Sequence, residues 1–200
     1  VMALANGDFW LGNDIAVQDE TNWRSDLGPT SLHVPHVFSS DAIYEIPSPI
    51  KWLKGFQLSA IFTASSGSAL NATQSSTRGS SRPDYIGGSV YLNTADRFLF
   101  LNRAAFVAVP VAPVSGGTIR PGNFGKNALI GPGRRNWDLS IAKSFTLRER
   151  FQFQIRAEAF NALNNVNLST PITDINNASF GRILAVGDAR RIQINARFTF

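Results

Sequence analysis

The sequence predicts an all-β fold of antiparallel strands. Five segments alternate apolar and polar side chains, their connections are either very short or very long, and aromatic residues gather near one end of the strands. The composition agrees, because 16 Gly and 10 Pro with only 16% charged residues favour turns and short strands over helices.

The clearest strand is the segment 191–200. Its even-numbered residues are apolar, its odd-numbered residues are polar, and it stops on the aromatic Phe200. Strict period-two alternation predicts a strand with one apolar face and one polar face. A terminal strand frays unless it is paired, so we interpret 191–200 as the closing strand of a larger sheet and expect it to pair with 151–159.

Four more segments show the same alternation. We expect strands at 36–46, 56–64, 137–145 and 151–159, the first two forming a hairpin. Phe160 breaks the alternation of its segment by one residue, which predicts a β-bulge near Ala159.

The connections sort by length. Turns 47–55 and 146–150 are short, whereas 66–135 and 161–189 are long and rich in Gly, Ser, Pro and Asn. We expect 66–135 to be a structureless connection, which is unusual inside a compact domain. Residues 1–32 are interpreted as a loop, with the end of an earlier strand at Val1–Ala5.

The aromatic residues indicate a membrane. With the short turns on one side, a single level of the sheet carries Trp52, Phe56, Phe145, Phe151, Phe153, Phe198 and Phe200. Trp137 lies eight residues from Phe145 on the same face, about 20 Å of height at a strand tilt near 40°. Membrane barrels carry aromatic girdles about this far apart, with short periplasmic turns and long extracellular loops. We therefore predict that residues 1–200 are a C-terminal fragment of about five strands from an antiparallel transmembrane β-barrel in the bacterial outer membrane, its apolar face on lipid.

Other features exclude several function classes. A chain without cysteine has no disulfide framework or thiol nucleophile. The net charge of +5 comes from scattered residues and not from a basic helix, so we expect no nucleic-acid partner. No apolar run approaches the roughly 20 residues of a spanning helix, and the first residues do not form a secretory signal. The missing signal is a second reason to expect a fragment.

The ordered motifs of this chain resemble the C-terminal end of TonB-dependent outer-membrane receptors, in the branch with a carboxypeptidase-regulatory-like N-terminal domain. The resemblance covers about residues 26–200 and rests on these runs: His36-Val37-Phe38, Tyr44-Glu45-Ile46-Pro47, Gly55-Phe56-Gln57-Leu58-Ser59, Ser66-Gly67, Arg82-Pro83-Asp84, Gly131-Pro132-Gly133-Arg134-Arg135-Asn136-Trp137-Asp138-Leu139-Ser140, Leu147-Arg148-Glu149-Arg150, Arg156-Ala157-Glu158-Ala159-Phe160-Asn161-Ala162-Leu163-Asn164, Phe180-Gly181-Arg182-Ile183, Gly187-Asp188-Ala189-Arg190 and the terminal Phe200. Pro35 departs from the family pattern, which has a basic residue there.

The resemblance implies a transporter that imports a bulky nutrient, such as a chelated metal or a carbohydrate, through a plugged barrel of about 22 strands. The implied partners are outer-membrane lipid, the barrel-assembly machinery, a TonB-type energy-coupling protein contacted by a missing N-terminal region, and an unknown nutrient. The implied insertion signal comprises Phe200, Phe198 and Ile194.

Four charged residues on the polar faces, Arg156, Glu158, Arg191 and Arg197, are candidates for the lumen wall. They could contact a plug or substrate, or be satisfied by one another and by water, which we favour. Ser, Asn and Gln of 66–135 could bind sugars or chelates.

Catalytic chemistry is not predicted. His33 and His36 are the only histidines, and spacing three in a strand puts side chains on opposite faces, so we expect no metal site. No serine is aimed at a base, and no phosphate loop is present. We expect no enzyme activity and no cofactor.

Two alternatives remain open. One is a soluble or surface β-sandwich that binds carbohydrate or protein; it would yield a monodisperse monomer without detergent, whereas a barrel fragment with open edges should aggregate. The other is a non-transporting porin or adhesin barrel, which a plug domain upstream in the gene would exclude.

We predict that a few polar residues appended after Phe200 in the full-length protein reduce barrel assembly, because they displace the terminal aromatic. Heat-modifiable migration on gels and surface display measure assembly. Unchanged values for both would contradict a role for Phe200 in insertion.

Overall fold

The structure is a computed structural model that describes residues 2–3, 18–19, 21–47, 49–50, 53–76, 79–148 and 151–200. It divides into two compact units. The first unit contains Val1–Pro35, Ser66–Gly133 and Leu168–Val186, and the second contains His36–Ser65, Arg134–Asn167 and Gly187–Phe200.

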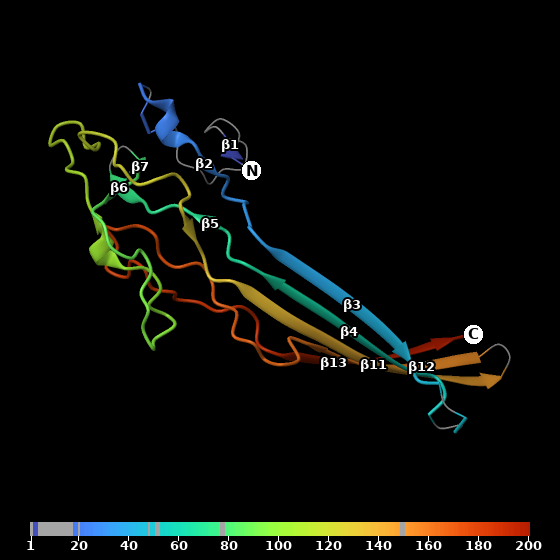
Figure 1. The fold of residues 1–200 in the computed structure, drawn as a ribbon. Coiled ribbons are helices and arrows are strands. Elements are labelled where there is room, and N and C mark those ends of the chain that lie inside the picture. The colour runs from blue at the N-terminus through green and yellow to red at the C-terminus, as the bar shows by residue number, and fades with distance from the viewer. Residues whose placement is uncertain are drawn as a thin grey trace. The chain divides into compact units, whose positions relative to one another are not determined.

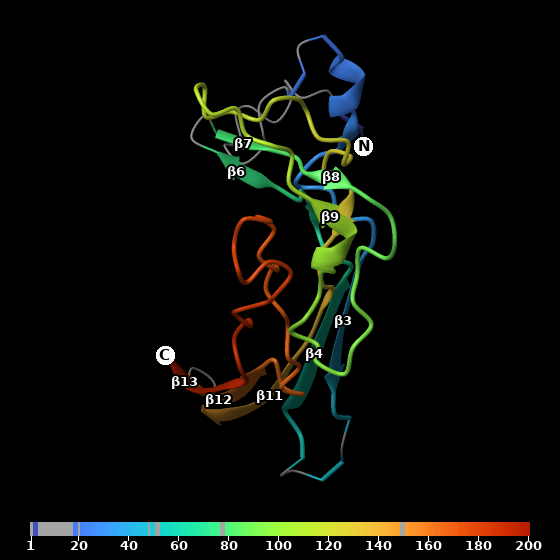
Figure 2. The same cartoon turned by 90° about the vertical axis from the view of Figure 1, so that its left-hand side faces the viewer.

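The second unit is one five-stranded antiparallel sheet with the strand order β13-β12-β11-β4-β3 (Figures 1 and 2). Its strands are β3 (Val37–Glu45), β4 (Phe56–Ser65), β11 (Arg134–Arg148), β12 (Phe151–Phe160) and β13 (Arg191–Thr199). All five predicted strands are present within a few residues of their expected bounds. The expected pairing of the closing strand is also confirmed, because β13 pairs with β12 from Gln152↔Thr199 to Phe160↔Arg191.

The predicted bulge near Ala159 is wrong. The β11–β12 register is continuous at Leu139↔Ala159, and it shifts between Thr146 and Arg148 instead. Phe160 stays in the strand and pairs with Arg191, so its aromatic ring simply joins the otherwise polar face. A break in alternation is therefore a change of side chain here and not an extra residue in the ladder.

The β3–β4 hairpin closes through a short turn that ends at Gly55. This glycine has φ +85°, and a Cβ there would lie 2.7 Å from the carbonyl oxygen of Ser144. The Gly55 carbonyl also accepts a hydrogen bond of 3.0 Å from the Ser144 amide. Only glycine combines this conformation with so close an approach, and the contact fixes the turn against β11. The connection from β11 to β12 is shorter still.

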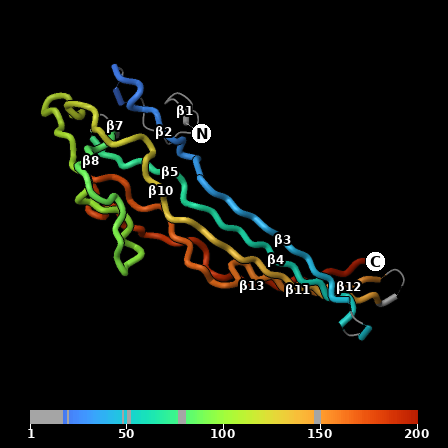
Figure 3. The backbone as a smooth tube through the Cα atoms, in the orientation of Figure 1, coloured from blue at the N-terminus to red at the C-terminus, as the bar shows by residue number. Residues whose placement is uncertain are grey.

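The first unit is built from short antiparallel pairs and loops. β1 (Met2–Ala3) pairs with β2 (Gly28–Pro29), and β5 (Ala69–Leu70) pairs with β10 (Leu129–Ile130), as the tube in Figure 3 shows for the latter pair. The remaining pairs are β6 (Gln74–Ser76) with β7 (Gly79–Ser81), and β8 (Asp84–Tyr85) with β9 (Phe106–Val107). In the described part of this unit, 3-10 helices cover Trp23–Asp26 and Arg103–Ala105. Of the expected strand end at Val1–Ala5, only β1 lies within the described residues.

The expectation that 66–135 is structureless is wrong. The segment supplies most of a hydrophobic core, which also receives two residues from the later connection; the buried members are Ala72, Leu101, Ala105, Phe106, Phe124, Leu129, Ile175 and Phe180. The Phe106 ring stands edge-to-face on Phe124 at 5.0 Å and on Phe180 at 5.6 Å between centroids. Burial of these aromatic and aliphatic side chains stabilises a part of the protein that has no long strands.

Several polar side chains of the first unit bond to its backbone or to one another. Gln74 is buried, its amide donates to the Val109 carbonyl at 2.7 Å, and its carbonyl oxygen accepts from the Val109 amide at 2.8 Å. Arg82 forms a buried ion pair with Asp26 at 2.6 Å. The Arg120 guanidinium, hydrogen-bonded to Asp84 at 2.5 and 3.0 Å, holds the pKa of that carboxyl below its usual value. Such residues hold the fold and are poor candidates for ligand binding.

We predict that Leu129→Ala lowers the free energy of opening of the first unit by about 2–5 kcal/mol, because a fully buried side chain leaves a cavity. Hydrogen–deuterium exchange of the full-length protein would show faster exchange in 99–131. Ile86→Ala is the control, since Ile86 is 62% exposed. Equal exchange in both variants would contradict a packed core.

Candidate functional site

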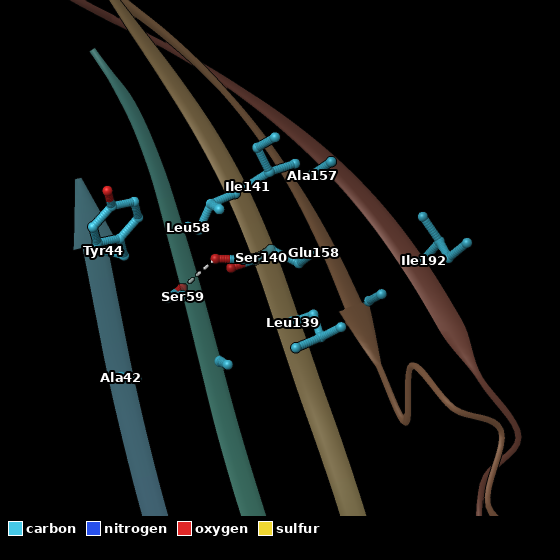
Figure 4. Close-up of a pocket in the computed structure, with 12 residues that line it drawn as sticks. Ala42, Tyr44, Leu58, Ser59, Leu139, Ser140, Ile141, Ala157, Glu158 and Ile192 are labelled. Atoms are coloured by element: carbon cyan, nitrogen blue, oxygen red, sulfur yellow. Dashed lines mark hydrogen bonds between the residues drawn. The ribbon is translucent and has the colours of Figure 1, made fainter. Parts of the chain in front are cut away.

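The sheet of the second unit has one apolar face. Paired residues of an antiparallel ladder point to the same side, so the registers align Tyr44, Leu58, Ile141, Ala157 and Ile194 in one row across all five strands. Figure 4 shows side chains of this face from neighbouring strands. The larger ones are exposed, Ile194 by 74% and Tyr44 by 58%. An apolar surface this extended is typical of a face that contacts lipid or a partner.

Aromatic side chains border this face at both ends. At the end with the long connections, Phe62 lies 5.9 Å from Phe38 and 4.5 Å from Trp137 between ring centroids. At the end with the short turns, the registers put Phe145, Phe153 and Phe198 in one row. The predicted level of aromatic residues is confirmed for that row. Trp52 lies outside the described residues.

The short-turn end carries further ring contacts beyond that row. Phe145 stacks on Phe153 at 6.2 Å, and Phe198 contacts Phe151 at 5.9 Å and Phe200 at 6.3 Å. Phe198 and Phe200 therefore belong to one aromatic group, while Ile194 lies two rows nearer the middle of the sheet than Phe198. Their role in insertion stays a prediction.

The strands have the length that a bilayer demands. A tilted transmembrane strand needs about 9–11 residues. β3, β4, β12 and β13 have 9, 10, 10 and 9 residues, and β11 has 15. The Ile141 row lies midway between Trp137 and Phe145, so aliphatic side chains occupy the middle and aromatic side chains the two borders.

The opposite face carries a hydrogen-bonded polar network that includes two of the predicted residues. The Arg156 Nε lies 3.0 Å from Glu158 Oε1, and an Arg156 Nη donates to Ser140 Oγ at 3.3 Å. Ser140 Oγ is in turn 2.5 Å from Ser59 Oγ, the contact dashed in Figure 4.

On the β13 side, Glu158 Oε2 accepts from Asn195 at 3.0 Å and from Gln193 at 3.5 Å. The network thus crosses β4, β11, β12 and β13. Arg156 and Glu158 both have partners on this face of the sheet. Their contacts favour charges that are satisfied by one another and by neighbouring side chains over charges held ready for a plug or substrate.

Arg191 and Arg197 lie on the same face but outside this network. The Arg191 guanidinium stands 5.2 Å from the Phe160 ring centroid, a cation–π contact at the long-connection end. Arg197, opposite Gln154, lines a cavity of about 280 Å³ at the short-turn end together with Ser144, Gln152 and Thr199. The four predicted residues share a face without forming one cluster.

Each face has exceptions that the sequence pattern did not single out. Ile43 and Ile61 lie on the polar face, where they are 67% and 47% exposed. Lys143 lies on the apolar face, opposite Phe56 and Ile155. The sequence could have predicted this position of Lys143, because every second residue of β11 from Trp137 to Phe145 belongs to the apolar face.

In the described part of the chain, no cluster of three His, Cys, Asp or Glu side chains could hold a metal ion. Among the same residues, no helix has the length and apolar character to cross a membrane. The strand argument about His33 and His36 needs correction, because β3 begins at Val37 and both histidines precede it.

Comparison with known proteins gives one match. A family model described as an outer membrane beta barrel domain matches residues 2–193. No curated protein matches. No solved structure matches either.

We predict that a charge on the apolar face destabilises the barrel and that the opposite face tolerates it. Ile194→Arg should lower the free energy of unfolding in lipid vesicles by about 2–4 kcal/mol, the cost of arginine near the midplane. Ile43→Arg is the matched control, the same substitution at an exposed position of the polar face one row away. Urea titration of the full-length protein measures both, and equal losses would contradict the face assignment.

Proposed function

The chain belongs to the outer membrane beta barrel domain family, and we propose that within this family it is the C-terminal barrel portion of a TonB-dependent transporter. The cargo of such a transporter is a bulky nutrient, such as a chelated metal or a carbohydrate. The observation that carries the proposal is the ordered series of motifs that resembles the C-terminal end of these receptors. The geometry of the sheet adds support at several points.

The family match points to the bacterial outer membrane. An outer-membrane barrel turns its apolar band to lipid and its polar face to the lumen, with short turns in the periplasm. The apolar face described above is therefore the lipid surface, and the Arg156–Glu158 network lies on the lumen side. Phe200 follows β13 at the periplasmic end.

The polar face of the sheet supports the proposal that the barrel interior holds water or protein. Amide, hydroxyl and charged side chains bond to one another from β4 to β13, and a polar surface of this kind needs a hydrated or polar neighbour. A plug domain supplied from elsewhere in the protein would meet that need. The exposed Ile43 and Ile61 would give such a plug apolar contacts on the same wall.

Several motif residues have architectural contacts. Asp138 accepts a hydrogen bond from the Asn161 amide at 2.8 Å, and the Asn161 side chain donates to the carbonyls of Asn165 and Asp188. Gly181, at φ +78°, lies so close to Leu101 that a Cβ would be 2.3 Å from its carbonyl oxygen. These motif residues therefore stabilise the fold, and they do not identify the cargo.

The partners that we propose follow from this assignment. They are the barrel-assembly machinery, a TonB-type coupling protein reached through a region outside this sequence, and the nutrient. We propose no enzyme activity and no nucleic-acid partner.

The runner-up is a porin or adhesin barrel that does not use energy. The long connections would serve an adhesin equally well, since 66–133 packs into a unit with its own core. The soluble sandwich is disfavoured, because the long strands form a single sheet whose apolar face is exposed.

We predict that the full-length protein imports its nutrient only when the inner membrane is energised. In liposomes the purified protein should pass no small solutes, because a plug fills the lumen. In cells, uptake should stop when the proton gradient is collapsed or the TonB-type protein is deleted. The controls are liposomes containing an open porin and cells lacking the gene.

Passive solute flux through the purified full-length protein would contradict the transporter and favour a porin. Cell attachment without any uptake would favour an adhesin. Neither outcome would affect the assignment of the sheet faces.

A further inference from the structure

Lys143 is the one charged side chain between Trp137 and Phe145 on the lipid-facing side of β11. It pairs with Phe56 and Ile155, one row nearer the middle of the sheet than the aromatic row Phe145, Phe153 and Phe198. A cation at that depth is costly unless its side chain reaches the bilayer surface.

The side chain of Lys143 reaches toward the periplasmic turn. Its ammonium donates to the Lys54 carbonyl at 2.6 Å and lies 4.4 Å from the Phe56 ring centroid and 5.4 Å from that of Phe145. Lys54 precedes Gly55, which hydrogen-bonds to Ser144, so the ammonium is drawn past its own row to the rim. Two aromatic rings and a carbonyl hold the positive charge where lipid headgroups begin.

An apolar groove lies on the same face beside this cation. It has a volume of about 480 Å³, and its floor is made by the small side chains Ala42, Ala60, Ala157 and Ala159. Larger side chains border it, among them Tyr44, Leu58, Ile141 and Ile192 (Figure 4). Lys143 does not line the groove, but Ile141 does, and it precedes Lys143 by two residues on the same face of β11.

We propose that Lys143 and this groove bind one anionic phospholipid of the periplasmic leaflet. The phosphate lies at the Lys143 ammonium, and an acyl chain lies in the alanine-floored groove. The inference depends on the outer-membrane assignment and is independent of what the barrel transports.

Charge complementarity argues for an anionic lipid. The described residues of the apolar face carry no carboxylate side chain. Glu158 also lines the groove, but its carboxylate is bonded to Arg156 and Asn195 in the network of the opposite face. A zwitterionic lipid carries its own ammonium, which competes with Lys143 for the phosphate. An ammonium that is already positioned by two rings and a carbonyl loses less freedom on binding than a mobile lysine.

Lipid retention measures the proposal directly. The full-length protein is placed in nanodiscs of phosphatidylglycerol and phosphatidylcholine with identical acyl chains, and native mass spectrometry counts the lipid that each barrel retains. We expect enrichment of phosphatidylglycerol on the wild-type protein. Lys143→Gln should reduce that enrichment about fivefold, the worth of one cation near an anionic surface.

Three variants separate the site from general charge and from misfolding. Lys143→Arg should keep the enrichment, because the charge remains. Arg197→Gln removes the same charge at a similar height on the opposite face and should leave the enrichment unchanged. Ala159→Leu fills the groove without changing charge and should reduce retention of the lipid.

Equal retention of the two lipids by the wild-type protein would overturn the proposal. So would a loss in Arg197→Gln as large as in Lys143→Gln, which would mean that only total charge matters. Heat-modifiable migration identifies any variant that fails to fold. Transport assays are a separate readout, so failure of the transporter proposal and failure of the lipid site are distinguishable.

Discussion

The register of the five strands is the constraint on which the rest of the structure depends. Backbone amides and carbonyls in lipid must be paired within the protein, and only a hydrogen-bonded ladder of strands or a helix achieves this. Because side chains alternate with period two, a slip of one residue would move every apolar side chain of a strand to the lumen side. The observed pairings keep apolar rows aligned from β3 to β13, so one set of hydrogen bonds creates both the apolar face and the polar face.

The first unit is stabilised in a different way, by a buried core and not by long paired strands. It contains no strand longer than three residues among those described, yet it buries Leu101, Phe106 and Phe124 with Ile175 and Phe180 from a distant segment. Its interior also holds the buried ion pair of Arg82 with Asp26. Long connections in this family member are therefore a folded structure with a defined interior.

The sheet was predictable from sequence because alternation is a local signal. Bounds, pairing and the row Phe145, Phe153 and Phe198 follow from reading every second residue and the lengths of the turns. The core of 66–133 was not predictable from sequence. Phe106 and Phe180 are in contact although 74 positions separate them, and no periodic pattern of apolar residues predicts that contact. The Lys143 contacts were also missed, because they depend on where Lys54 lies in the turn. Sequence likewise proposed Arg156 and Glu158 but not Ser59, Ser140, Gln193 or Asn195 as their neighbours.

The assignment of the two faces is the central claim, and cysteine scanning of β13 tests it most directly. Residues 1–200 contain no cysteine. Each single cysteine substitution at positions 192–197 of the full-length protein therefore adds one labelling site to this part of the chain. A spin label at each site reports contact with oxygen dissolved in lipid or with a water-soluble nickel complex. The account predicts period-two alternation, with even positions in lipid and odd positions in water. Accessibility without alternation, or with the opposite phase, would contradict it.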